Sequence, residues 1–287
     1  VVIEINKILF LVFIDDFEPN KLCKIDKLPP TSCPFTCPIL LYLDSLKEYN
    51  RDNNTTYEET DFKIPTEAYY DLGGSFTPVT FIDENNVERS VNYRIPNDAQ
   101  CIVCHKKRQV INNVNVDTYV PIGIKPQNLN FGYTYSSTSR NQLSKWIEQG
   151  YLQNNFTFPA IANSTIDYED TSKPLLARAR SYVDINCAHC HQDNRHCDYR
   201  PMRFAFSETA NNNTNMGVCV DTQDMQDFPE SLNKIITPGN INRSMMYYRL
   251  NTTDEAIRMP LHGRTVIHDE GIALIQAWIN SLTTQCN

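Results

Sequence analysis

The chain has 287 residues, of which 41% are hydrophobic and 21% are charged, the balance of a folded protein rather than a disordered one. That length is enough for about two or three domains. The net charge of −8 excludes nucleic acid as an expected partner, because phosphate binding needs a basic face, and it favours protein partners with basic surfaces. The apolar run 8–14 is too short to cross a bilayer, so we expect no membrane span and interpret it as a buried strand.

Strand-like patterning marks the first 95 residues. The segment 77–95 has two arms with alternating apolar residues, separated by a turn at 83–86. One arm carries Val79 and Phe81, and the other carries Val87, Val91, Tyr93 and Ile95. We therefore predict a hairpin here, within an N-terminal β-rich domain over residues 1–95.

Two short cysteine motifs dominate the rest of the chain. The first, CIVCH, comprises Cys101, Cys104 and His105, and the second, CAHCH, comprises Cys187, Cys190 and His191. Cys-x-x-Cys-His is the attachment signature of c-type haem. The two thiols add across the two vinyl groups of one porphyrin, and the adjacent histidine then binds the iron as its proximal ligand. The sequence therefore predicts two covalently bound haem c groups.

Other uses of paired cysteines fit less well. A joint zinc site would have to unite pairs that begin 86 residues apart (187 − 101), whereas zinc ribbons usually keep their pairs closer and need no histidine after each. A thioredoxin-like redox pair would need only one motif, at the start of a helix that follows a strand. Two independent matches that both include the histidine favour haem.

Helical patterns surround both motifs from residue 96 onward. The two tryptophans, Trp146 and Trp278, lie in similar amphipathic segments, each with an apolar-x-x-Trp-Ile pattern and each after one motif. We expect an internal duplication of one haem-binding helical unit, although two unrelated amphipathic helices would show the same pattern. A further helix, with Ser172 as its cap and Pro174 in its first turn, is predicted to lead into Cys187.

A low-spin haem needs a second axial ligand, usually methionine or histidine. For the second haem we predict Met259, which lies 68 residues after His191 (259 − 191) in a Met-Pro loop before the last helix, as in class I cytochromes c. The alternative is that Met259 only fills the core. At the equivalent place for the first haem stands Lys125, which is a candidate ligand unless it is a solvated charge or a propionate partner.

The first haem has further options. No methionine or histidine lies between His105 and Trp146, so a remote residue could reach its iron, or the iron could lack a strong sixth ligand. The remote candidates are Met202, Met216, Met245, Met246, His196 and His262. We expect His189, in the variable part of its motif, to point away from its own iron.

Six of the ten cysteines lie outside the two motifs (10 − 4). Haem c is attached outside the bacterial cytoplasm or in the mitochondrial intermembrane space, and up to three disulfides fit that oxidising setting. Cys197 and Cys219 flank a loop after the second motif and are the predicted pair, and the alternative is that some of the six are free buried thiols. The connectivity of the others stays open; they are Cys23, Cys33, Cys37 and Cys286. We predict a periplasmic or extracellular protein.

The chain from about residue 90 to 285 resembles a family of secreted bacterial dihaem c-type cytochromes. The resemblance rests on an ordered series of segments: YRIPNDAQCIVCH, PIGIKPQNLN, NQLSKWIEQGYL, RSYVDINCAHCH, PGNINRSMMYYRL and MPLHGRTVIHDEGIALIQAWI. It implies electron transfer, and a β-rich region before the first haem. The expected fold is α+β overall. It has two mainly α-helical, class I cytochrome c-like domains, at 96–168 and 169–287, after the β-rich domain.

We therefore expect an electron carrier rather than a catalyst, working with redox protein partners. A dihaem peroxidase with an open first haem is the enzymatic alternative, although the sequence has no convincing motif for the acid–base group it would need. A subunit of an electron-conducting filament, or another homo-oligomer, is the third alternative, because an unfilled position on the first haem could accept a residue from a neighbouring subunit.

Overall fold

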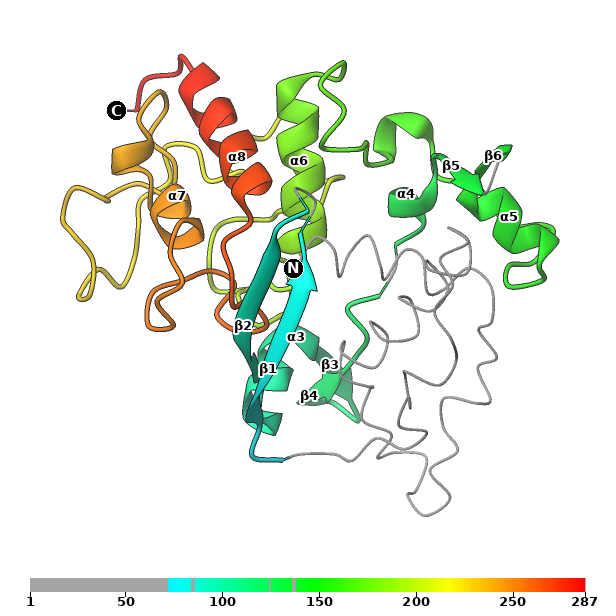
Figure 1. Ribbon diagram of the computed structural model, residues 1–287, viewed down its shortest axis with the longest axis horizontal. Coiled ribbons are helices and arrows are strands. Elements are labelled where there is room, and N and C mark those ends of the chain that lie inside the picture. The colour runs from blue at the N-terminus through cyan, green and yellow to red at the C-terminus, as the bar shows by residue number, and fades with distance from the viewer. Residues whose placement is uncertain (1–71, 84–85, 124, 136–137, 287) are drawn as a thin grey trace.

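The computed structural model describes residues 72–83, 86–123, 125–135 and 138–286 (Figure 1). Our predictions for the first 71 residues, which include the strand at 8–14 and the pairing of Cys23, Cys33 and Cys37, lie outside this part of the chain. Within it, no helix is both long and apolar enough to cross a membrane.

The predicted hairpin before the first motif is confirmed. Strands β1 (Ser75–Ile82) and β2 (Glu88–Ile95) pair antiparallel, with Val79 opposite Val91. At the turn, Asn86 has a φ of 58°, a left-handed conformation that asparagine tolerates better than most residues. Tyr93 on β2 is buried and anchors one face of the hairpin.

Two further hairpins occupy the segment 106–141, which the sequence analysis had placed in a helical domain. Strands β3 (Lys106–Ile111) and β4 (Val114–Tyr119) are joined by Asn112 and Asn113, with φ values of 52° and 62°. Positive φ at both central positions is what a type I′ hairpin turn requires, and asparagine is one of the few residues that adopt it readily. Strands β5 (Gly132–Tyr135) and β6 (Thr138–Asn141) form the second of these hairpins.

The described helices are α3 (Asp98–His105), α4 (Pro126–Leu129), α5 (Gln142–Glu148), α6 (Leu175–Asn186), α7 (Met245–Leu250) and α8 (Asp269–Ser281), with 3-10 turns at Ile161–Asn163 and Ile241–Arg243. The two longest of them, α6 and α8, lie in the second half of the chain. The prediction of two mainly α-helical, class I cytochrome c-like domains is therefore wrong. The region 75–141 is β-rich, because its turn-forming asparagines and alternating residues favour hairpins over helices.

The main hydrophobic core lies between α6 and α8, which pack side by side with α7 next to them (Figure 1). Both helices follow the sequence prediction. On α8, Ile275 and Trp278 are almost fully buried, and Val183 of α6 faces them in the same core. Burying a side chain of this size stabilises the fold by about 1.5–3 kcal/mol. The start of α6 differs slightly from the prediction, because Pro174 occupies the N-cap position and Ser172 does not cap it.

A buried carboxylate joins α6 to the segment around α4. The Asp184 side chain is fully buried, and it accepts hydrogen bonds from Lys125 Nζ at 2.6 Å, Phe206 N at 2.8 Å and Asn128 Nδ2 at 2.9 Å. Buried charges persist in proteins when they are paired and hydrogen-bonded in this way. The pair therefore fixes α6, and with it the second cysteine motif, against the first half of the chain.

The structure corrects the predicted disulfide. Cys219 bonds to Cys286, whereas Cys197 is a buried free thiol. The loop that contains Cys219 is attached to the end of α8, where Gly239 N donates to Ile279 O at 2.9 Å. Cys197 instead stays beside its own motif, with its amide donating to Cys190 O at 3.1 Å. Proximity in sequence favoured the wrong partner.

Replacing Cys286 by serine is expected to lower the free energy of unfolding by about 4 kcal/mol, because the chain-entropy model assigns that value to a loop of roughly 70 residues. Chemical denaturation with and without a thiol reductant measures the effect. The reductant should bring the wild type to the level of the variant and leave the variant unchanged. Peptide mapping that finds a Cys197–Cys219 bond would contradict the assignment.

Candidate functional site

The first cysteine motif forms the C-terminal part of α3. Asn97 caps this helix through a reciprocal pair of hydrogen bonds with Gln100, at 2.9 and 3.1 Å. The helix ends at His105, whose Nδ1 lies 3.0 Å from the carbonyl oxygen of Val120 at the end of β4. When Nδ1–H donates to a carbonyl, Nε2 keeps its lone pair for a metal, which is the usual arrangement of a histidine ligand.

The second motif lies in a turn directly after α6. The amides of Cys190 and His191 donate to the carbonyl of Cys187 at 3.1 and 3.0 Å, which compacts the motif. The His191 ring is buried against Phe204, with ring centroids 5.2 Å apart. Its Nδ1 has no hydrogen-bond partner among the described residues. Burial is the main cause that lowers the pKa of His191 to about 3, so the ring is neutral at physiological pH, the form that binds metals.

The two motifs meet in space although they are far apart in sequence. The ligand atoms of Cys104, His189 and Cys190 all lie within 4.8 Å of one another, and Cys190 Sγ is 3.3 Å from Val103 O. The hydrogen bond between the two thiols is the main cause that holds the pKa of Cys104 well below its usual value and raises the pKa of Cys190. His189, expected to be a bystander, therefore lies at the junction of the motifs.

An apolar cavity extends from this junction into the core. Residues of both motifs line it, and so does Met259, the predicted distal ligand. Apolar side chains from the second half of the chain form most of its wall: Met202, Phe204, Ile235, Met245, Leu250 and Ile272. Its volume is about 120 Å³. Usual ligand pockets measure roughly 300–1,000 Å³, so a porphyrin would have to push these side chains apart.

Met259 and His191 both line this cavity, although they lie in different segments of the chain. His191 follows α6, whereas Met259 lies in the loop between α7 and α8. That loop is attached to the end of α7 by a hydrogen bond from Met259 N to Arg249 O at 2.9 Å. The structure thus places at one cavity the imidazole and the thioether that we predict from the sequence as the two ligands of the second haem.

The other predicted ligands differ in whether they line this cavity. Lys125 does not line the cavity, because its ammonium group is bound to Asp184. Of the remote methionines, Met202, Met245 and Met246 line the cavity, while Met216 is buried in the core away from it. His268 also lines the cavity, but its Nδ1 caps α8 by accepting from Gly271 N at 3.1 Å.

Sequence reasoning did not identify two arginines at this site, Arg249 and Arg264. Arg264 is 5% exposed, and burial lowers its pKa to about 10. Burial is also the main cause that lowers the pKa of Arg249. Single arginines are usually solvated, so no local pattern marked these two.

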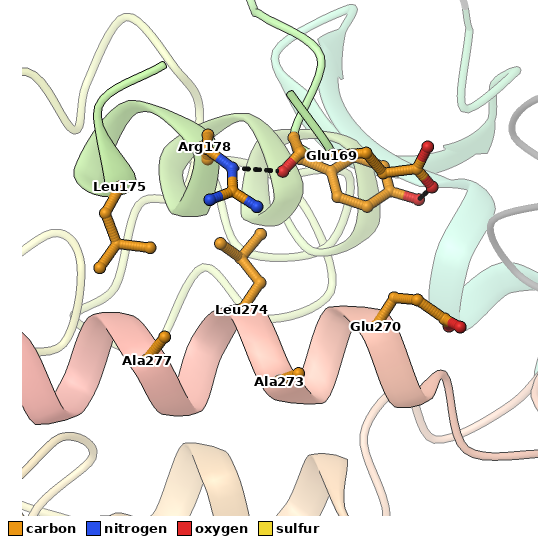
Figure 2. Close-up of a pocket in the computed structure, with 8 residues that line it drawn as sticks. Glu169, Leu175, Arg178, Glu270, Ala273, Leu274 and Ala277 are labelled. Carbon is orange, nitrogen blue, oxygen red and sulfur yellow. Dashed lines mark hydrogen bonds between the residues drawn. The ribbon is translucent and has the colours of Figure 1, made fainter. Parts of the chain in front are cut away.

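A second cavity, of about 370 Å³, lies in the groove between α6 and α8 (Figure 2). The side chains of Leu175 and Arg178 face it from α6, and those of Leu274 and Ala277 face it from α8. Arg178 Nε donates to the Tyr168 carbonyl at 2.7 Å, so its position serves the fold. No cysteine or histidine is among the described residues that line this groove, and we assign it no chemistry.

Comparison with known proteins adds no further identification: no family model matches the chain, and no curated protein or solved structure matches it.

Proposed function

We propose that the chain is a c-type cytochrome that carries two haems and transfers electrons between redox proteins in the periplasm or outside the cell. The bacterial dihaem family that the sequence resembles suggests the same function. The first haem would be held by Cys101, Cys104 and His105, and the second by Cys187, Cys190 and His191.

The observation that supports the proposal best is that His191 and Met259 line one apolar cavity together with the second cysteine pair. Imidazole and thioether are the axial ligands of electron-transferring cytochromes c. The buried Nδ1 of His191 also lacks a partner among the described residues, which is unusual for a ring that serves only packing.

The residues of the chain would hold and insulate the cofactors. Each haem, when bound, would supply one-electron redox chemistry between a donor protein and an acceptor protein. The Val120 carbonyl orients the ring of His105 so that Nε2 is the nitrogen left for a ligand role. The apolar wall excludes water from the second site, and low polarity is one of the factors that tune a haem potential.

The proximity of the two motifs bears on how the haems would work together. Cys104 and Cys190 belong to different motifs, and their sulfur atoms lie within 4.8 Å. The two attachment points would therefore be neighbours, and a short separation favours electron exchange within the molecule before electrons leave for a partner.

The proposal predicts two covalent haems per chain when the protein is exported in a host with a c-type maturation system. The pyridine haemochrome spectrum measures haem per protein. We expect a ratio of two for the wild type and one for a Cys187→Ala/Cys190→Ala variant, because the variant has no thiol in its second motif to form a thioether bond. A folded, exported wild type without haem would refute the proposal.

The meeting of Cys104, His189 and Cys190 favours a soft-metal site as a second candidate function. Only these three ligands gather among the described residues, whereas structural zinc sites use four. Elemental analysis of the same purified protein separates the two functions. Two irons per chain without zinc supports the cytochrome, and one zinc per chain without haem absorption supports the soft-metal site.

A further inference from the structure

Two arginines that line the cavity of His191 and Met259 form no ion pair with a carboxylate among the described residues. Arg264 is almost fully buried, and its two terminal nitrogens donate to the carbonyls of Leu250 at 2.6 Å, Arg249 at 3.3 Å and Thr252. Its Nε is buried and has no hydrogen-bond partner among the described residues. Carbonyl oxygens satisfy donors but do not neutralise the charge of the guanidinium.

Arg249, on α7, is half-buried, and its hydrogen bonds also go to backbone carbonyls. Its Nε donates to Ile257 O at 2.7 Å, and its guanidinium lies over the ring of Phe228, 5.3 Å from the centroid. Neither Arg249 nor Arg264 forms an ion pair with a carboxylate in the described part of the chain. Both arginines line the cavity that also contains His191 and Met259.

A third arginine nearby, Arg258, is also buried but does form an ion pair with a carboxylate. Arg258 is 4% exposed, and it forms an ion pair with Glu255 at 3.1 Å. It does not line the cavity. Burying a cation without a counter-ion is costly, so the two unpaired arginines indicate a site for an anionic ligand with carboxylate groups on an otherwise apolar body.

We propose that Arg249 and Arg264 bind the propionate carboxylates of the second haem, with Arg264 Nε as the donor reserved for this ligand. The inference rests on the proposed function, because it assumes the haem held by Cys187, Cys190 and His191. Guanidinium and carboxylate form strong, charge-assisted hydrogen bonds, so the two arginines would fix the orientation of the macrocycle within the cavity. Their role is positioning and electrostatic tuning.

The experiment compares Arg264→Gln with the matched variant Arg258→Gln in the full chain matured with haem. The readouts are the number of haems per chain and the midpoint potential of the methionine-ligated haem. Loss of a positive charge about 10 Å from the iron, at an effective dielectric of about 20, lowers the ratio of reduced to oxidised haem at a fixed potential roughly tenfold. That tenfold change corresponds to a shift of about 59 mV in the midpoint potential for one electron. Arg258 is paired with Glu255 and does not line the cavity, so for Arg258→Gln we expect this ratio to change by less than about twofold.

Two further variants keep the test decisive. Arg264→Lys retains the charge and should restore the ratio of reduced to oxidised haem to within about twofold of the wild-type ratio. A purely steric role of Arg264 would not predict this recovery. Arg249→Gln should lower the ratio in the same direction, and it replaces Arg264→Gln if that protein does not fold. Haem-loaded Arg264→Gln and Arg249→Gln proteins with the wild-type potential would overturn the inference and leave the cytochrome proposal standing. A haem-free wild type would overturn the cytochrome proposal itself.

Discussion

Replacing Met259 by leucine is expected to lower the midpoint potential of the proposed second haem strongly, by a substantial part of the roughly 0.8 V over which axial ligands set haem potentials. Leucine has nearly the same volume but no sulfur, so it removes the ligand while the packing changes little. A thioether raises the potential of a haem relative to nitrogen ligands, and its loss favours the ferric state. Redox titration followed by visible absorption measures the shift.

The matched control is Met216→Leu. Met216 is also buried in the core, but it does not line the cavity. Its replacement should leave both potentials unchanged and cost less than about 1.5 kcal/mol of stability. If Met259→Leu behaves like this control, Met259 is core filler and the second haem has another distal ligand.

Replacing Asp184 by alanine is expected to lower the free energy of unfolding by roughly 3–5 kcal/mol, the usual cost of removing one partner from a buried ion pair. The change removes a carboxylate that accepts from three donors: Lys125 Nζ, Asn128 Nδ2 and Phe206 N. Lys125 is 35% exposed and can regain water, whereas Asn128 is buried and keeps only its bond to Thr165 Oγ1 at 3.2 Å. Urea denaturation monitored by circular dichroism measures the loss.

Lys173→Met provides the comparison for an exposed pair. Lys173 lies 3.9 Å from Asp170, and both side chains are well exposed to solvent. Its loss should change stability by at most about 0.5 kcal/mol. An Asp184→Ala protein as stable as Lys173→Met would mean that Asp184 is not the link between α6 and the first half of the chain.

The sequence predicted the elements whose signals are local. The hairpin at β1 and β2 follows from alternation over a few residues, and α6 and α8 follow from apolar stripes at helical spacing. The type I′ turn at Asn112 and Asn113 has an equally local signal, because adjacent asparagines readily adopt positive φ. The wrong fold class came from extending the helical pattern of the motifs over the whole segment after residue 96.

The two cysteine motifs and the helix before the second motif could be recognised from the residues alone, because both signals depend on spacing along the chain. Only the tertiary structure decided which distant groups meet. It brought Cys104 next to Cys190, Met259 to the cavity of His191, and Cys286 to Cys219. It also buried Arg264 and half-buried Arg249 at the same cavity, where neither forms an ion pair with a carboxylate among the described residues. Such contacts depend on how helices and loops pack, and packing joins residues whose separation in sequence contains no information about their distance in space.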